Sequence, residues 1–314
     1  METPSQQSAS EWFEALGPFP EHVPPLSLIH FTSRDCAQKI LSRGELKVTP
    51  PSELNDPFEF NPGIPGDTPT PHEISEFLAD QIGFGPVFVE ELRAELGADT
   101  DLQEFCLNNP KRVHRFLLEK HQQIRTRISE CFGVVCFTAI DPLKEESIRQ
   151  WAIYGDKHAG VAIEFSGTSE FMRLWAKAKL LYPVDYPPQP RIKLVLADLI
   201  GLRDHAWWPL FRRWGGTKSQ FWAPEREWRL FKPLGAYPEF PSREISENGK
   251  VHRLWQIWNS PAEAASMIRR VVLGCRFDKE MEGELRSVCR DLGLTDEQVV
   301  HARAHHSDFC FSPS

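Results

Sequence analysis

Short apolar runs of strand length recur along this chain, and segments with helical periodicity separate them, which restricts the folds that the chain can adopt. The runs at residues 25–32, 131–138, 161–165 and 268–274 are rich in β-branched and aromatic residues. Runs of this length and composition favour β-strands. Because helical patterns lie between them, the sequence predicts a mixed α+β fold.

The helical patterns are densest in one part of the chain. Residues 1–25 are rich in Pro, Ser and Gln, and we expect them to form a flexible lead-in. Residues 26–314 are expected to form a single α+β domain. Within it, residues 72 to about 129 have apolar residues at helical spacing. This segment is therefore predicted to be a helical insertion that could cap a site.

The composition excludes several classes of protein. A net charge of −8 argues weakly against non-specific binding to nucleic acid or to an anionic membrane. The seven cysteines include no Cys-x-x-Cys pair, which fits a reducing compartment. No apolar segment approaches the roughly 20 residues of a membrane span, and the N-terminus lacks the features of a signal peptide. We expect a cytoplasmic protein that makes no membrane contact.

Two carboxylates, Glu225 and Glu227, stand close together in the aromatic stretch 220–231. If this stretch is extended, both side chains point to one face, because residues two apart in a strand share a face. Each would then raise the pKa of the other, which suits acid–base chemistry or stabilisation of a cation. Alternatively, with Arg226 and Arg229 they would form a ladder of surface ion pairs.

Other polar residues stand where a ligand could bind. His30 ends a predicted strand just before a helix N-terminus, where free backbone N–H groups suit an anionic or ribose-bearing ligand. It could equally be a core histidine bound to a backbone carbonyl. The turn that holds Asn55, Asp56 and Glu59 could contact a substrate or a metal, although turn chemistry alone explains it.

Histidine and cysteine are also concentrated near the C-terminus. The residues are His301, His305, His306 and Cys310. Their spacing matches no standard zinc site, so no metal is expected.

Five motifs follow one another along the chain, at Ile29–Thr32, Leu54–Glu59, Cys136–Thr138, Trp151–Val161 and Lys218–Arg229. Taken in this order, they resemble the motifs of a bacterial family known as the domain of unknown function 2971. They cover most of the chain. This resemblance does not itself imply a function.

A second, more distant resemblance does imply one. His30 lies in a predicted strand, a later strand leads into a helix with Ser147 and Tyr154, and a Glu225-Arg-Glu227 segment follows late in the chain. This order is similar to the one found in ADP-ribosyltransferases of the His-Tyr-Glu type. The resemblance implies an ADP-ribosyltransferase-like split β-sheet core with a helical insertion. It also implies that NAD is bound as a substrate.

The same resemblance implies roles for particular residues. His30 would hydrogen-bond the nicotinamide ribose beside Thr32, and Tyr154 would stack on the nicotinamide ring. Glu227 would bind the ribose 2′-hydroxyl as the catalytic residue, and Glu225 would orient the acceptor. The other residues expected near NAD are Phe137, Ser147 and Trp151. Those expected to contact substrate or to support the site are Asn55, Asp56, Glu59, Lys218 and Arg229.

We therefore expect an enzyme that cleaves NAD at the bond between nicotinamide and ribose and transfers ADP-ribose to a protein or nucleic acid. Such an enzyme could be a bacterial toxin or a phage-defence effector with an antitoxin partner. One alternative is a nucleotide-binding module without catalysis. Another is a Mg²⁺-dependent hydrolase or nuclease that uses Asp56, Glu59, Glu225 and Glu227. The first interpretation predicts that Glu227→Gln abolishes activity while preserving the fold.

Overall fold

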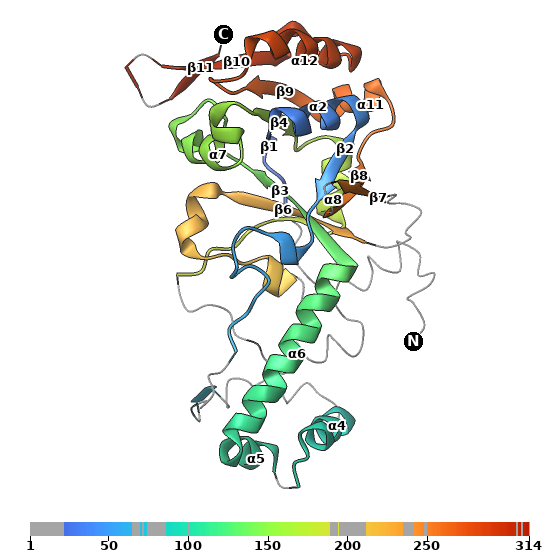
Figure 1. Ribbon diagram of the computed structural model, residues 1–314, viewed down its shortest axis with the longest axis vertical. Helices are drawn as coiled ribbons and strands as arrows, with labels where there is room; N and C mark the ends of the chain where they lie inside the picture. The colour runs from blue at the N-terminus through green and yellow to red at the C-terminus, as the bar shows by residue number, and fades with distance from the viewer. Residues whose placement is uncertain are drawn as a thin grey trace. The chain divides into compact units, whose positions relative to one another are not determined.

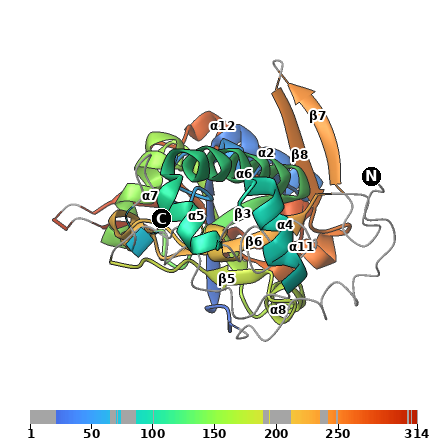
Figure 2. The same ribbon diagram turned by 90° about the horizontal axis from the view of Figure 1, so that it is seen from below.

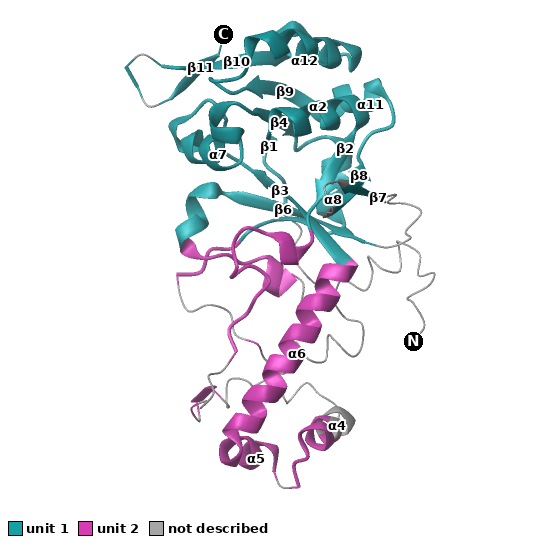
Figure 3. Cartoon of the chain, in the orientation of Figure 1, with its two compact units in different colours: residues 1–49, 132–184, 221–314 teal, residues 50–131, 185–220 magenta. Residues whose placement is uncertain are grey.

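The computed structural model divides the chain into two compact units (Figure 3). The first, called here the sheet unit, comprises residues 1–49, 132–184 and 221–314, and the second, the helical unit, comprises residues 50–131 and 185–220. The residues described are 22–64, 70, 72–73, 86–99, 101–188, 194, 212–234, 242–247, 250–305, 307–308 and 310–313. Residues 1–21 of the predicted lead-in therefore lie outside the described residues.

The helical unit contains the segment that was expected to be a helical insertion. The helical insertion was expected over residues 72–129, but the helical unit begins at residue 50 and also includes residues 185–220. The difference arises because residues far apart in sequence pair within this unit. The Leu194 amide, for example, donates to the Gly63 carbonyl at 2.7 Å.

A mixed sheet is the main feature of the sheet unit, and it confirms the expected mixture of helices and strands. Among the residues described, its eight strands run in the order β11-β10-β9-β4-β1-β3-β6-β5. Neighbouring strands are antiparallel, except for the parallel pair of β9 and β10. The strands are β1 (Ser27–Thr32), β3 (Phe132–Thr138), β4 (Val161–Ser166), β5 (Leu181–Pro183), β6 (Glu227–Pro233), β9 (Ile268–Leu273), β10 (Val299–Ala304) and β11 (Phe311–Pro313).

A smaller sheet in the same unit consists of β2 (Glu45–Val48), β8 (Lys250–Gln256) and β7 (Ser242–Glu247), in that order. Figure 2 shows β7 and β8 as a hairpin that extends away from the large sheet. The two sheets meet where Thr49, just after β2, exchanges backbone hydrogen bonds with Val134 of β3. A Cβ atom on Gly133 would lie 2.2 Å from the Val48 side chain, so only glycine permits this approach.

Helix α2 (Arg34–Arg43) shows how local sequence sets an element. Ser33 caps its N-terminus by accepting from the Cys36 amide, and Gly44 ends it with a left-handed φ of 69°. Its apolar stripe, formed by Ala37, Ile40 and Leu41, is buried. The other α-helices described in the sheet unit are α7 (Ile148–Ile153), α8 (Glu170–Lys177), α11 (Pro261–Met267) and α12 (Lys279–Asp291).

The strand register defines two faces of the large sheet, because directly paired residues share a face. Phe31 pairs with Ala162, which pairs with Val272, and these three residues form a buried cluster with Leu143 and Trp151. Trp151 belongs to α7, and its ring meets that of Phe31 edge-on at 4.9 Å. We call the face under α7 the α7 face. Helices α2 and α11 contact β4, and Figure 1 shows them on the other side of β1 from α7.

The helical unit contains α4 (Pro86–Leu96), α5 (Leu102–Asn108) and α6 (Pro110–Cys131). Helix α6 buries residues spaced three or four apart, as a helix that packs along one stripe must. These are Val113, Leu117, His121, Ile124 and Ile128. His121 is thus a core histidine of this unit, and its ring lies 5.7 Å from that of Trp214.

No helix in the part of the chain that the structure describes is long and apolar enough to cross a lipid bilayer.

Candidate functional site

The segment from Glu225 to Glu227 is a turn that leads into a strand, which corrects the expected extended conformation. Glu225 ends a 3₁₀ segment, η5 (Gln220–Glu225), and β6 starts only at Glu227. Between them Arg226 has a left-handed φ of 45°, which is uncommon for a residue with a side chain. The Arg226 carbonyl accepts a hydrogen bond from the Ala139 amide at 3.2 Å, which holds the turn against the end of β3.

Glu225 is a buried carboxylate held by two elements. Its side chain is 3% exposed, and its Oε1 accepts a hydrogen bond of 3.1 Å from the Tyr154 hydroxyl, at the end of α7. Its backbone carbonyl accepts a hydrogen bond of 2.6 Å from the Thr138 hydroxyl, at the end of β3. The structure thus brings together Tyr154 and Glu225, two of the residues predicted for the site.

Glu227 forms a buried ion pair with Arg229. Arg229 donates from Nε to Oε1 at 2.7 Å and from a terminal nitrogen to Oε2 at 3.1 Å, which makes a two-pronged pair. Neither side chain is more than 6% exposed. The pair forms because residues two apart in β6 share a face. A charge pair of this kind holds both partners in place, and removing either one leaves the other charge buried.

His30 lies on the opposite face of the sheet from Glu227. Glu227 pairs with Thr138, and Thr138 pairs with Ile29, so these three side chains share the α7 face. His30 is the next residue after Ile29 and therefore points the other way. The structure therefore does not bring His30 to the face of the sheet that holds Tyr154 and Glu227.

The chemical environment of His30 fits a structural role. Its Nδ1 lies 3.0 Å from the Cys136 carbonyl oxygen, and its ring packs against Phe137. Burial lowers the pKa of His30 below its usual value, although the hydrogen bond to Cys136 opposes that shift. Thr32 shares this face because it follows His30 by two residues in β1. Phe137 shares it because the pairing of Ile29 with Thr138 places Phe137 opposite His30. These three predicted NAD contacts are therefore separated from Tyr154 by the sheet.

Ser147 and Trp151 are also held in structural contacts. The Ser147 hydroxyl lies 2.9 Å from the Pro142 carbonyl and 2.7 Å from that of Lys144, at the start of α7. The Trp151 indole N–H donates to the same Pro142 carbonyl at 2.8 Å, and the side chain is 1% exposed. Both residues fix α7 on the sheet, and the orientation of Tyr154 depends on that position.

The predicted residues Asn55, Asp56, Glu59 and Lys218 belong to the helical unit. Asn55 is exposed, whereas Asp56 and Glu59 are buried. Asp56 Oδ1 accepts the Phe58 amide at 2.8 Å, as expected of an Asx turn. Lys218 Nζ lies 3.1 Å from Glu59 Oε1, and both side chains are at most 3% exposed. This pair ties two segments of the helical unit together.

Several buried polar residues were not predicted from the sequence, and three of them are described here. Thr138 follows the Cys136–Phe137 strand and holds Glu225, and strand alternation alone could have placed it on the face of Cys136. Gln150 precedes Tyr154 by one helical turn and is 2% exposed. Lys232, near the end of β6, is fully buried. Neither Gln150 nor Lys232 has a sequence signal that would distinguish it from an exposed polar residue.

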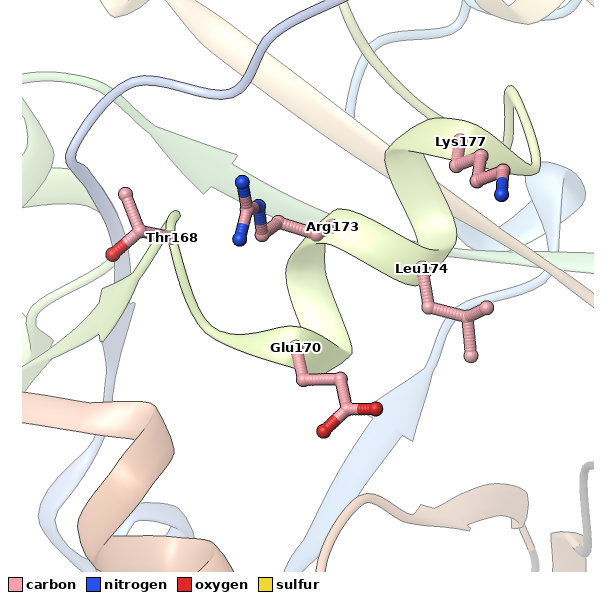
Figure 4. Close-up of a pocket in the computed structure, with 5 residues that line it drawn as sticks. All are labelled: Thr168, Glu170, Arg173, Leu174 and Lys177. Carbon is pink, nitrogen blue, oxygen red and sulfur yellow. The ribbon is translucent and has the colours of Figure 1, made fainter.

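A surface hollow lies along α8 and is separate from these residues (Figure 4). It is lined by Thr168, Glu170, Arg173, Leu174 and Lys177, all of which are exposed. The side chains spread along the helix and do not converge on a point. We therefore assign it no chemistry.

Searches with protein-family models, against curated proteins and against solved structures found no match to this chain.

Proposed function

We propose that the sheet unit cleaves NAD at the bond between nicotinamide and ribose, with Glu225 as the carboxylate that stabilises the transition state. The C1′–N1 bond breaks, and its electron pair leaves with nicotinamide. A nucleophile of a protein or nucleic-acid acceptor, or water, bonds to C1′ and loses its proton. A carboxylate fixed beside C1′ stabilises the positive charge that develops on the sugar.

The hydrogen bond from Tyr154 to Glu225 is the observation that carries this proposal. It orients a buried carboxylate beside an aromatic ring that can stack on nicotinamide, and Thr138 holds the backbone of the same residue. We assign the catalytic role to Glu225 in place of Glu227, because Arg229 donates hydrogen bonds to both carboxylate oxygens of Glu227. The division of the strands into a large and a small sheet is compatible with the split-sheet fold expected of an ADP-ribosyltransferase.

Gln150 offers a way to recognise the nicotinamide group. It is 2% exposed, and neither its amide oxygen nor its amide nitrogen has a hydrogen-bond partner among the residues described. Buried polar groups in folded proteins are nearly always hydrogen-bonded. The carboxamide of nicotinamide has one acceptor and a donor, which complement those of a glutamine amide. We propose that Gln150, one turn before Tyr154, binds this carboxamide.

The alternative of a Mg²⁺ site has less support. Of its four proposed carboxylates, Glu59 is paired with Lys218 and Glu227 with Arg229, both in buried pairs. A buried ammonium or guanidinium group already supplies the positive charge that a Mg²⁺ ion would bring.

The test is release of nicotinamide from NAD by the purified protein, measured by chromatography with EDTA present and with cell lysate as a source of acceptors. Glu225→Gln should lower kcat by about 100-fold and leave the thermal midpoint nearly unchanged. Tyr154→Phe should lower kcat by about tenfold, since it removes one hydrogen bond. Gln150→Met should mainly raise KM.

Glu227→Gln is the matched control, because it removes a carboxylate two residues away. It should lower the thermal midpoint and leave turnover per folded molecule within a few-fold of the wild-type value. No release by the wild type with any lysate, or equal release by Glu225→Gln, would overturn the proposal. Binding of NAD without release would instead favour a nucleotide-binding module.

A further inference from the structure

The hairpin of β10 and β11 places a histidine and a cysteine side by side. Arg303 pairs with Ser312 and Ala304 with Phe311, and the His305 amide donates to the Cys310 carbonyl at 2.9 Å. His305 and Cys310 therefore form the next pair of the hairpin. Opposite residues of an antiparallel pair have Cβ atoms about 5 Å apart and point to the same face. The backbone register thus sets the proximity of this imidazole and this thiol.

The loop between them adds a carboxylate. Asp308 Oδ2 lies 3.0 Å from Nδ1 of His305, and one ligand atom from each of His305, Asp308 and Cys310 lies within 4.8 Å of the others. The amides of Ser307 and Asp308 donate to the same Nδ1 at 3.4 and 3.2 Å, and the Ser307 hydroxyl lies 3.3 Å from it. The carboxylate oxygen 3.0 Å from Nδ1 makes this position favourable for a cation, which would replace the two amide donors at Nδ1.

The hairpin that presents these groups is anchored at both strands. β10 pairs with β9 of the large sheet, and the Phe311 amide donates to the Leu143 carbonyl at 3.0 Å. The Phe311 ring packs against those of Trp151 and His158, at 6.3 and 6.0 Å. Because the strands are fixed, little additional ordering is needed to bring the three ligand groups onto one ion.

We propose that His305, Asp308 and Cys310 bind a divalent transition metal of the zinc type. Nitrogen, oxygen and sulfur ligands together suit Zn²⁺ and Co²⁺, and exclude Mg²⁺ and Ca²⁺, which prefer oxygen alone. Ligand atoms on one tetrahedral zinc lie about 3.5 Å apart. The three ligand atoms here lie within 4.8 Å of one another, so no two of them must approach by more than about 1.3 Å. Three protein ligands leave the fourth position for water or for another ligand. The sequence spacing gave no sign of this site, because the strand pairing creates it.

Cobalt(II) titration of the full-length chain, followed by absorption spectroscopy, tests this proposal. One equivalent of Co²⁺ should produce a thiolate-to-cobalt charge-transfer band in the near ultraviolet, and Zn²⁺ should remove it by competition. Cys310→Ser should abolish the band, and His305→Ala and Asp308→Asn should weaken binding at least tenfold. Cys36→Ser, which removes an exposed thiol on α2, is the matched control and should leave the band intact.

Circular dichroism of each variant checks that the fold is retained, which we expect because the substituted side chains lie at least partly exposed in the loop. Absence of a thiolate band in the wild type would overturn the proposal. So would a band that persists at the same affinity in Cys310→Ser. Because the readout is binding of the metal ion alone, the result does not depend on whether the chain cleaves NAD.

Discussion

Lys232 offers a quantitative test of the packing on the face of the sheet opposite α7. It is fully buried, and its Nζ donates to the Pro233 carbonyl at 3.1 Å and lies 5.8 Å from the centre of the Trp255 ring. The Trp255 ring in turn packs against that of Trp175 in α8. Burial in these surroundings lowers the pKa of Lys232 from 10.5 to about 8.

The expected effect of Lys232→Met follows from this pKa. A shift from 10.5 to about 8 means that the charged amine destabilises the folded state by about 3 kcal/mol at neutral pH. Loss of the hydrogen bond to the Pro233 carbonyl offsets about 1 kcal/mol. Methionine has a similar length and no charge, so Lys232→Met should increase the free energy of unfolding by about 2 kcal/mol at pH 7.

The gain should depend on pH in a defined direction. Because the folded-state pKa is depressed, the penalty is absent above pH 10.5, grows as the pH falls, and is complete below about pH 8. Urea unfolding of wild type and variant should therefore show a gain of about 2 kcal/mol at pH 7 that falls below about 1 kcal/mol at pH 9.5. A gain that does not change with pH, or a loss at pH 7, would refute the reasoning.

Lys218→Met is the matched control, since it makes the same substitution at another buried lysine. Lys218 is paired with Glu59, whose carboxylate would be left buried without this partner. The variant should lose about 3 kcal/mol of stability in the same urea assay. Equal effects of the two substitutions would show that the pairing of Lys218 with Glu59 does not set the response to loss of a buried amine.

Three further predictions concern the large sheet. Glu227→Gln should lower the free energy of unfolding by about 3 kcal/mol, measured in urea, because the Arg229 guanidinium stays buried; a change under about 0.5 kcal/mol would argue against a structural pair. Gln150→Met should raise that free energy by about 1 kcal/mol while weakening NAD binding, whereas a loss of stability would indicate a hydrogen-bond partner for the amide. Burial lowers the pKa of His30 in the folded state, so the stability that its neutral form contributes is full above pH 6.5. That stability is lost as the pH falls through the folded-state pKa. The thermal midpoint should accordingly drop less between pH 7 and pH 5 in His30→Gln than in the wild type.

Local signals in the sequence were sufficient to predict most elements of the sheet unit. Ser33 and Gly44 mark the ends of α2 because capping and the left-handed conformation depend only on neighbouring residues. The apolar runs that became β1, β3, β4 and β9 were recognisable because each is a short buried strand between turn residues. The alternation of side chains along a strand could not show that Arg226 interrupts the extended backbone between Glu225 and Glu227. The left-handed φ of Arg226 is held by the hydrogen bond from the Ala139 amide, which comes from another strand end.

The sequence by itself thus determined the mixed fold class, the caps and the strand runs, because these depend on composition and on contacts a few residues apart. The tertiary structure alone decided which candidate residues meet. His30 and Glu227 lie on opposite faces because the pairings of β1 with β3 and of β3 with β6 join residues far apart in the chain. A hydrogen bond between residues far apart in the chain also joins Tyr154 to Glu225. His305 and Cys310 are close in the chain, and the pairing of β10 with β11 places them opposite each other. A shift of one residue in any strand would exchange the faces, and no local pattern specifies that register across separate strands.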